Sequence, residues 1–454
     1  MGISKKQTIQ KSAGVSRRQM LKTAGAGAVA LSAASLFAPY VQRGALAADK
    51  SLKILQWSHF VPAYDTWFDA FAKSWGEQNK VTVVVDHIPH LEIPARAAAE
   101  VAAQSGHDLF GFNGAGGPFL HRKNTLDMTQ LIGAVEKKFG KATAVGRGLA
   151  YDTIEERWVG YPDFYINLPG LYRKDLWDEI GMKPDTWEDV RIGGAKLKAK
   201  GHPVGISLGH SVDPETSWRA VLFSYGASID DKTGKHVMLN SKEALEAVKF
   251  VKALYTEAMT SEVTSWDDAS NNQYLQSGRG CYIQNPISAY RSTQKTNPAL
   301  ADNIFPWKAP AGPVRRMAAG SPNAYVVWKF AQNPDAAKAF LLHYATNWVE
   351  AFKASTAYNM PVFPHIVPKP MPILSNDPTS HPADKLKVLE TSDEWMCIYG
   401  WPGPGSPQAA EVAGDYIVTD MMAQAATGNK TPEESLKWAV AQVDAVYDKW
   451  KNIA

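Results

Sequence analysis

The stretch of sequence that decides the fold runs from Trp158 to Trp187 and reads WVGYPDFYINLPGLYRKDLWDEIGMKPDTW. Its first part, Trp158 to Leu168, is a short apolar run that favours a β-strand. A helix is expected from Lys174 to Ile180, because the pattern stops at Gly181. A second helix is expected to open at Asp185 or Thr186, where acidic side chains suit the positive end of a helix dipole. The crowded aromatic residues are typical of a chain that crosses between two lobes and lines a cleft.

Three short strands alternate with two helices before this stretch. The strands are expected at Leu52–Gln56, Val81–Asp86 and Asp108–Phe112, with helices at Tyr64–Trp75 and Ile93–Gln104 between them. Val81–Asp86 is nearly all β-branched, which predicts a buried parallel strand. This β-α-β-α-β order predicts a doubly wound α/β sheet, in which ligands bind beyond the carboxyl ends of the strands. We therefore expect ligand contacts in the loops at 57–60, 86–90 and 112–117.

Several short motifs share their order with one protein family. They are Tyr161-Pro162, Leu171-Tyr172-Arg173-Lys174-Asp175-Leu176, Pro184-Asp185-Thr186-Trp187-Glu188-Asp189, Leu239-Asn240-Ser241 and Asn333-Pro334-Asp335-Ala336-Ala337. In this order they resemble the extracellular solute-binding proteins of bacterial ABC importers, in the maltose-binding-like family. Arg173 stands where that family usually has asparagine. The resemblance covers nearly the whole chain after the N-terminal segment.

The resemblance implies a type II periplasmic binding protein, with two doubly wound α/β lobes joined by a hinge. The family's crossing points place lobe 1 at 48–163 plus 304–346 and lobe 2 at 164–303 plus 347–454. Two lobes also suit the 407 residues that follow the N-terminal segment, since single cores stop growing at roughly 250–300 residues. The resemblance further implies a monomer that delivers its solute to permease subunits in the inner membrane.

The segment 1–47 is predicted to be a twin-arginine export signal. Arg17-Arg18 precede a weakly apolar, Ala- and Gly-rich run, and Ala45-Leu46-Ala47 offers a small-residue cleavage site. A membrane anchor is the alternative, but Ser32, Ser35 and Pro39 interrupt the run. We expect an exported protein that is free in the periplasm, because no cysteine follows the signal to carry a lipid.

Charge and cysteine content narrow the function further. The signal holds seven basic residues and no acidic ones, so the remainder has 41 basic and 45 acidic residues, a net charge of −4. Such a mildly acidic chain offers no general reason to bind nucleic acid. Cys281 and Cys397 are the only cysteines, and an oxidising periplasm allows them to pair. Cys281 lies in an apolar run, however, where a buried thiol is the simpler interpretation.

Catalytic and metal-binding patterns find little support. The sequence has no G-x-S-x-G and no H-E-x-x-H, and its histidines lack metal-ligand spacing. The acidic pairs Glu155-Glu156 and Asp267-Asp268 are interpreted as solvated charge rather than as an acid and a base. We therefore expect no enzyme activity, no cofactor and no metal.

Aromatic residues outside the predicted core stripes are the positive signal for a ligand. Flat rings suit the CH face of a sugar, while amides take its hydroxyls. Combined with the positions that contact ligand in the resembling family, this selects as ligand-binding candidates Trp57, His59, Asn113, Tyr165, Asn167, Trp218, Trp266, Asn285 and Trp401. For each of these rings, burial in a lobe core is the competing interpretation.

The sequence thus predicts the periplasmic solute-binding component of an ABC importer, with a sugar, oligosaccharide or glycoside as the favoured solute. Two alternatives stay open. One is an exported carbohydrate-active hydrolase or lyase. The other is a binding protein for a polyamine, a small acid or an aromatic cofactor.

Overall fold

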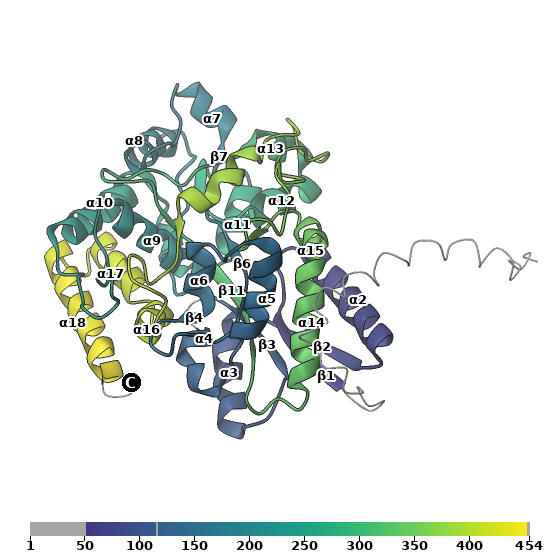
Figure 1. Cartoon of the computed structure of the whole chain (residues 1–454). Helices are drawn as coiled ribbons and strands as arrows, with labels where there is room; N and C mark the ends of the chain where they lie inside the picture. Colours follow the sequence, from purple (N-terminus) through teal and green to yellow (C-terminus); the bar gives the residue numbers. More distant parts are fainter. Residues whose placement is uncertain (1–50, 115–116, 452–454) are drawn as a thin grey trace, which may run out of the picture. The chain divides into compact units, whose positions relative to one another are not determined.

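The computed structural model describes residues 51–114 and 117–451. The predicted export signal at 1–47 lies outside these residues, as do Ala115 and Gly116 of the predicted loop at 112–117. Two sheets organise the described chain, and each has its own set of helices (Figure 1).

The larger sheet carries the three strands that were predicted first along the chain. Its six strands are, in spatial order, β12 (Asn359–Pro361), β6 (Tyr161–Ile166), β11 (Ser321–Val327), β3 (Leu109–Asn113), β1 (Ser51–Trp57) and β2 (Thr82–Ile88). β1 pairs in parallel with β2 and β3, while β11 runs antiparallel between β3 and β6. The carboxyl ends of β1 and β3 therefore lie at the same edge of the sheet.

The prediction that Val81–Asp86 is a buried strand is wrong. β2 is an edge strand that pairs only with β1, and its residues alternate between exposed and half-buried. Val84 keeps 45% of its surface exposed. Its β-branched residues reflect the preference of such side chains for a pleated backbone, which edge and central strands share.

Helices pack around the larger sheet from both early and late parts of the chain (Figure 1). They are α2 (Pro62–Asn79), α3 (Ile93–Ala103), α4 (Gly117–Leu120), α5 (Thr129–Phe139), α6 (Ala144–Ala150), α14 (Pro334–Thr346) and α15 (Trp348–Ala354). The predicted aromatic stripe of α2 faces inward, because Tyr64, Phe68 and Trp75 are buried. A short ladder of β4 (Tyr151–Asp152) and β5 (Arg157–Trp158) precedes β6.

The smaller sheet has three strands, all antiparallel to their neighbours, in the order β8 (Tyr282–Gln284), β7 (Gly170–Arg173) and β9 (Ile304–Trp307). A parallel bridge from Val204 to Tyr282 extends it beyond β8. The remaining helices are α7 (Lys174–Glu179), α8 (Trp187–Lys198), α9 (Val212–Ser224), α10 (Lys242–Ala258), α11 (Ser270–Gln276), α12 (Ser288–Thr296), α13 (Pro298–Asn303), α16 (Pro407–Gly414), α17 (Ile417–Ala426) and α18 (Pro432–Lys451). The ladder of β10 (Ala318–Ala319) and β13 (Met396–Cys397) stands apart from both sheets.

The chain passes between the two sheets three times. It leaves the larger sheet after β6, returns between β9 and β11, and leaves again after β12. β9 was placed in lobe 1 by the predicted boundaries and β12 in lobe 2, but β9 pairs in the smaller sheet and β12 in the larger one. We therefore propose that the lobes divide later than predicted, near 167 and near 308, and after β12, which ends at Pro361.

Local capping signals explain where two of these helices begin. Thr186 caps α8 with a complete capping box, since its Oγ1 accepts from the backbone N–H of Asp189 and Asp189 accepts from the N–H of Thr186. Thr431 and Glu434 form the same reciprocal pair ahead of α18. The start of α8 was predicted from the sequence and is confirmed.

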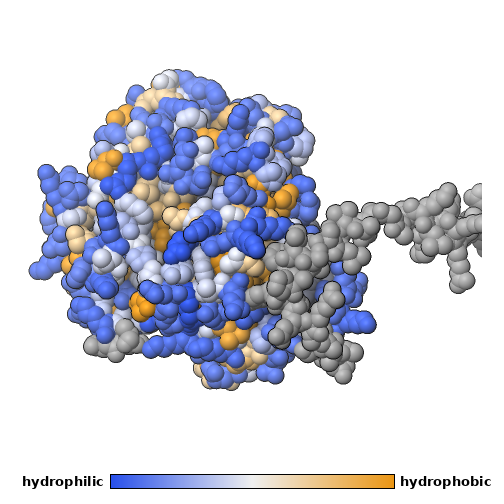
Figure 2. All heavy atoms as spheres, viewed as in Figure 1, coloured by the Kyte–Doolittle hydropathy of each residue, from blue (hydrophilic) through white to orange (hydrophobic). Residues whose placement is uncertain are grey.

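The face of the molecule seen in Figure 2 is largely hydrophilic, with small separate hydrophobic spots. The cysteines Cys281 and Cys397 are buried and unpaired, so they do not form the disulfide that the sequence left open. Across residues 51–114 and 117–451, no helix combines the length and apolar character that a membrane span needs.

Candidate ligand-binding cleft

A cavity of about 510 Å³ lies at the carboxyl end of β3, where a doubly wound sheet is expected to bind its ligand. Its size falls within the range of small-molecule sites, roughly 300–1,000 Å³. The end of β3 lines it together with helices α3, α4, α9, α16 and α18 and the loops beside them; the lining residues are His90, Leu91, Pro94, Asn113, Gly114, Leu120, Val212, Glu215, Thr216, Arg219, Gly320, Tyr399, Glu411, Ala413, Gly414, Asp415, Tyr416 and Lys449. We refer to it as the cleft cavity.

Asn113, at the end of β3, is the residue of the larger sheet that lines the cleft cavity. It is the last residue of β3, so its side chain leaves the sheet where the strand opens into the loop. Its Nδ2 is buried and has no hydrogen-bond partner among the described residues. Gly114 follows with a φ of 87°, and a Cβ built there would lie 3.3 Å from Cγ2 of Val212. The two walls of the cleft cavity therefore approach closely beside Asn113.

The opposite wall is formed by α9, whose residues are buried from Asp213 onward. Glu215 and Arg219 form an ion pair one helical turn apart. Thr419 Oγ1 also donates to Glu215 (2.9 Å). Burial raises the pKa of Glu215, and the Arg219 charge opposes that shift. Arg219 Nε is buried with no partner among the described residues, so this wall presents a second unused donor.

A contact across the cleft ties the two walls together. His90 Nε2 lies 2.7 Å from Asp268 Oδ2. Asp268 also accepts from the backbone N–H groups of Val212 (3.2 Å) and Asp213 (2.8 Å) at the start of α9, where a carboxylate suits the helix dipole. The interpretation of Asp268 as solvated charge is wrong, because only 3% of it is exposed.

The C-terminal helices close the cleft cavity. Tyr416 stands between α16 and α17 with a φ of 55°, a left-handed conformation that a non-glycine residue adopts only where its surroundings impose it. Its ring stacks on His210, with ring centroids 5.1 Å apart. Burial and the neighbouring charge of Glu411 raise the pKa of Asp415. This wall thus combines one aromatic face with acceptor oxygens.

Of the nine residues predicted to bind ligand, Asn113 alone lines the cleft cavity. Trp57 Nε1 donates to Asn323 Oδ1 (3.0 Å), and His59 Nε2 lies 2.9 Å from Asn359 Oδ1. Tyr165 shares a hydrogen bond with Ser392 (2.9 Å). These three side chains are buried and connect β1 and β6 to neighbouring segments of the protein. Their ligand contacts stay predictions.

The remaining predicted residues lie elsewhere in the fold. Trp218 is fully buried and donates to the Ser207 carbonyl (2.8 Å), and Trp266 packs at 4.9 Å from Tyr274. Asn285 Nδ2 donates to Asn272 (2.5 Å). Asn167 lies where the chain leaves β6, and neither of its amide atoms has a hydrogen-bond partner among the described residues. Trp401 lines a separate cavity of about 730 Å³.

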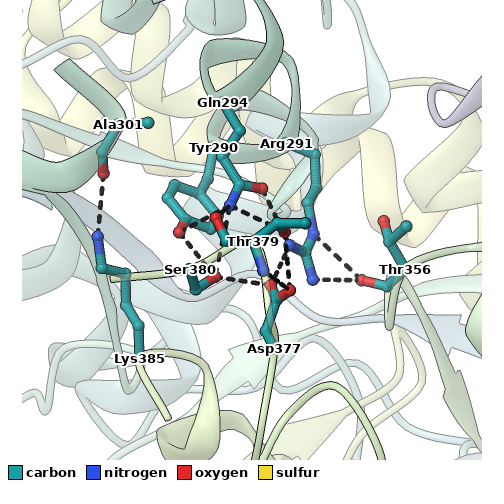
Figure 3. Close-up of polar contacts among 9 residues, drawn as sticks. All are labelled: Tyr290, Arg291, Gln294, Ala301, Thr356, Asp377, Thr379, Ser380 and Lys385. Carbon is teal, nitrogen blue, oxygen red and sulfur yellow. Dashed lines mark hydrogen bonds and ion pairs between the residues drawn. The ribbon is translucent and has the colours of Figure 1, made fainter. Parts of the chain in front are cut away.

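A second dense polar cluster lies on α12 and the 377–385 segment and has a structural role (Figure 3). Arg291 pairs with Asp377 and donates to the Thr356 carbonyl (2.9 Å). Lys385 Nζ donates to the carbonyls of Ala301 (3.0 Å) and Asp302 (3.1 Å), and burial lowers its pKa to about 8. These bonds hold an irregular segment against helices, and none of these side chains lines the cleft cavity.

Sequence reasoning missed Glu215, Arg219 and Tyr416. Glu215 and Arg219 sit in a helix that is buried on all sides, so no apolar stripe singles out their face. Tyr416 follows Gly414-Asp415, a pair that indicates a break between helices. That break between helices was the available signal.

Comparisons with known proteins identify the family and the fold of the chain. A family model described as bacterial extracellular solute-binding protein matches residues 66–379. No curated protein sequence gives a significant match. Among solved structures, a sugar transporter from Arthrobacter chlorophenolicus A6 with bound laminaribiose superposes with a TM-score of 0.74 at 17% identity, covering 87% of this chain and 99% of that one.

Two further structures show the same fold. Maltose-bound MalE3 of T. maritima gives a TM-score of 0.72 at 18% identity, with 87% of this chain and 99% of that chain covered. The GacH receptor of Streptomyces glaucescens, solved unliganded and with acarbose, gives 0.70 at 15% identity, covering 88% and 98%. The fold of the chain is therefore the two-lobed α/β fold of type II periplasmic binding proteins, as predicted.

Proposed function

Because the chain belongs to the bacterial extracellular solute-binding protein family, we propose that it binds a sugar or oligosaccharide in the cleft cavity and delivers it to an ABC importer. The observation that carries the sugar assignment is the pair of buried, unpartnered donors, Asn113 Nδ2 and Arg219 Nε, on opposite walls. Buried polar atoms are normally hydrogen-bonded, so a ligand with several hydroxyl or ring oxygens would satisfy them.

The other lining groups support a neutral, polyhydroxylated ligand. Tyr416 offers a ring face for sugar CH groups, and the carboxylates of Glu411 and Asp415 accept from hydroxyls. The strongest charges are already paired, since Glu215 bonds Arg219 and Glu411 bonds Lys449 (2.7 Å). A small acid would need an unpaired positive charge, and both Arg219 and Lys449 are already paired. The structural neighbours that carry laminaribiose, maltose or acarbose favour the same class.

Binding and closure are coupled in this proposal. The ligand contacts walls from both lobes, so it stabilises the closed arrangement in which the lobes approach. Its affinity therefore reflects how much more tightly it binds the closed arrangement than the open one. The His90–Asp268 contact joins the same walls. We infer that delivery to the permease follows export by the twin-arginine signal, and that the ligand is bound without being converted.

A thermal-shift screen of mono- and oligosaccharides tests the ligand class. A sugar at 100 times its dissociation constant should stabilise the protein by about 2.7 kcal/mol. Asn113→Ala should weaken binding of that sugar about two- to tenfold, the range expected for one hydrogen bond. Asn240→Ala, an exposed asparagine outside the cleft cavity, is the matched control and should bind normally. Stabilisation by amines or acids alone would contradict the sugar assignment, and turnover of a bound glycoside would indicate an enzyme.

A further inference from the structure

The cavity of about 730 Å³ is separate from the cleft cavity and shares none of its lining residues. Three chain segments form its walls, namely α6 with the turn that follows it, the turn at 232–235, and the loop at 396–405. We refer to it as the basic cavity. Close packing of glycines sets its shape, because a Cβ at Gly405 would lie 2.4 Å from the Gly148 carbonyl oxygen.

All the charged side chains that line the basic cavity are positive. They are Arg147, Lys232 and Lys235, and no aspartate or glutamate is among the lining residues. Within residues 51–114 and 117–451, none of the three forms an ion pair. The adjacent Asp231 is occupied within its own turn, where it accepts from Thr233 Oγ1 (2.7 Å) and the Lys235 backbone N–H (3.1 Å). The positive charge around this cavity is therefore not neutralised by the lining.

The guanidinium of Arg147 stacks against two aromatic rings. Its guanidinium carbon lies 3.8 Å from the centroid of the Tyr151 ring and 5.9 Å from that of Trp158. Stacking of this kind leaves the N–H groups at the edge of the guanidinium available to a ligand. A planar fork of donors in a set position suits a carboxylate or a phosphate.

An apolar surface adjoins these charges. Trp401 is half-buried in the wall, packed against Phe223 at 5.2 Å, and the Arg315 guanidinium lies 4.8 Å from its ring centroid. Ile398, Pro402 and Pro404 continue this surface. An inorganic anion would leave such a surface unused, whereas a sugar ring bearing an acidic group would cover it.

We propose that the basic cavity binds a sugar acid or a sugar phosphate. The anionic group lies among Arg147, Lys232 and Lys235, and the ring lies against Trp401. This site is distinct from the cleft and does not rest on the sugar assignment made there. A failure of cleft binding and a failure of this site are therefore measured separately.

Isothermal titration calorimetry of the purified protein tests the site with four probes, glucuronate, glucose 6-phosphate, glucose and inorganic phosphate. The double variant Lys232→Gln/Lys235→Gln should weaken both anionic sugars about tenfold or more, because each lost charged contact is strong. Raising the salt concentration should weaken them as well. The matched control is Lys73→Gln/Lys437→Gln, which removes the same charge from exposed sites outside both cavities and should bind like the wild type.

The two lysine side chains are exposed and form no hydrogen bond or ion pair within the described residues, so this variant should melt at the wild-type temperature. Trp401→Ala gives a second readout and should weaken the anionic sugars while leaving inorganic phosphate unchanged. The proposal is overturned if neither anionic sugar binds, or if both bind the lysine variant as tightly as the wild type. Equal affinity for inorganic phosphate and glucose 6-phosphate would refute the proposed contact between the sugar ring and Trp401.

Discussion

Replacing His59 with glutamine should make the protein's stability less sensitive to acid. His59 follows β1 and is buried. Its Nδ1 accepts from the backbone N–H of Val61 (2.9 Å), so Nε2 carries the proton and donates to Asn359 Oδ1 (2.9 Å). Burial lowers the pKa of His59 to about 4, against an ordinary value of 6.5, although the bond to Asn359 acts in the opposite direction.

The sign of the effect follows from proton uptake. Below pH 6.5 the unfolded chain binds a proton at His59, while the folded protein resists this until about pH 4. Stability contributed by the neutral ring is thus complete above pH 6.5 and is lost as the pH falls through 4. The full difference is about 3 kcal/mol, and the part lost between pH 6.5 and 5 is about 2 kcal/mol.

Urea unfolding of the wild type and of His59→Gln at pH 7.5, 6.5 and 5 measures this loss. Other titrating groups are common to both proteins and cancel in the difference of their unfolding free energies. The advantage of the wild type over the variant should shrink by about 2 kcal/mol between pH 6.5 and 5. A difference that stays constant over this range would refute the buried, neutral state of His59.

Three further outcomes are expected. Burial raises the pKa of Asp163 to about 7, although Trp348 Nε1 donates to it (3.0 Å), so wild-type stability relative to Asp163→Asn should fall as the pH rises from 4 to 7 in the same urea series. Thr186→Ala removes the cap of α8 and should cost about 1 kcal/mol in urea unfolding at neutral pH, whereas Thr186→Ser should retain most of it. Changing Arg17 and Arg18 together to lysine should leave precursor in the cytoplasm on cell fractionation, and normal periplasmic yield would show another export route.

Local signals account for the parts of the fold that were predicted well. Strands β1 and β3 and helices α2 and α3 begin and end within a few residues of their expected positions, and α8 begins where it was expected. Each is specified by contacts between residues near in sequence, such as the Thr186–Asp189 capping box. The edge position of β2 was not predicted, because strand order depends on which distant segment pairs beside it.

The candidate site was predicted only in part for a related reason. Loops after β1 and β3 were identified from topology, and Asn113 does line the cleft cavity. Glu215, Arg219 and Tyr416 come from α9 and the C-terminal helices, about 100 to 300 residues further along the chain. Nothing in the local sequence around these three residues indicates that they lie opposite the loop after β3.

The sequence by itself determined the elements, the two-lobed α/β family and the absence of an excess of positive charge after the signal segment. These depend on periodicity, caps, motif order and composition. All four are properties of the linear sequence and do not depend on contacts with distant segments. Tertiary structure alone decided which polar groups stay unpaired, as with Asn113 Nδ2 and Arg219 Nε beside one cavity and the three cations beside the other. A hydrogen bond or an ion pair needs its partner within a few ångströms, and the folded chain, rather than the linear one, decides whether that partner is present.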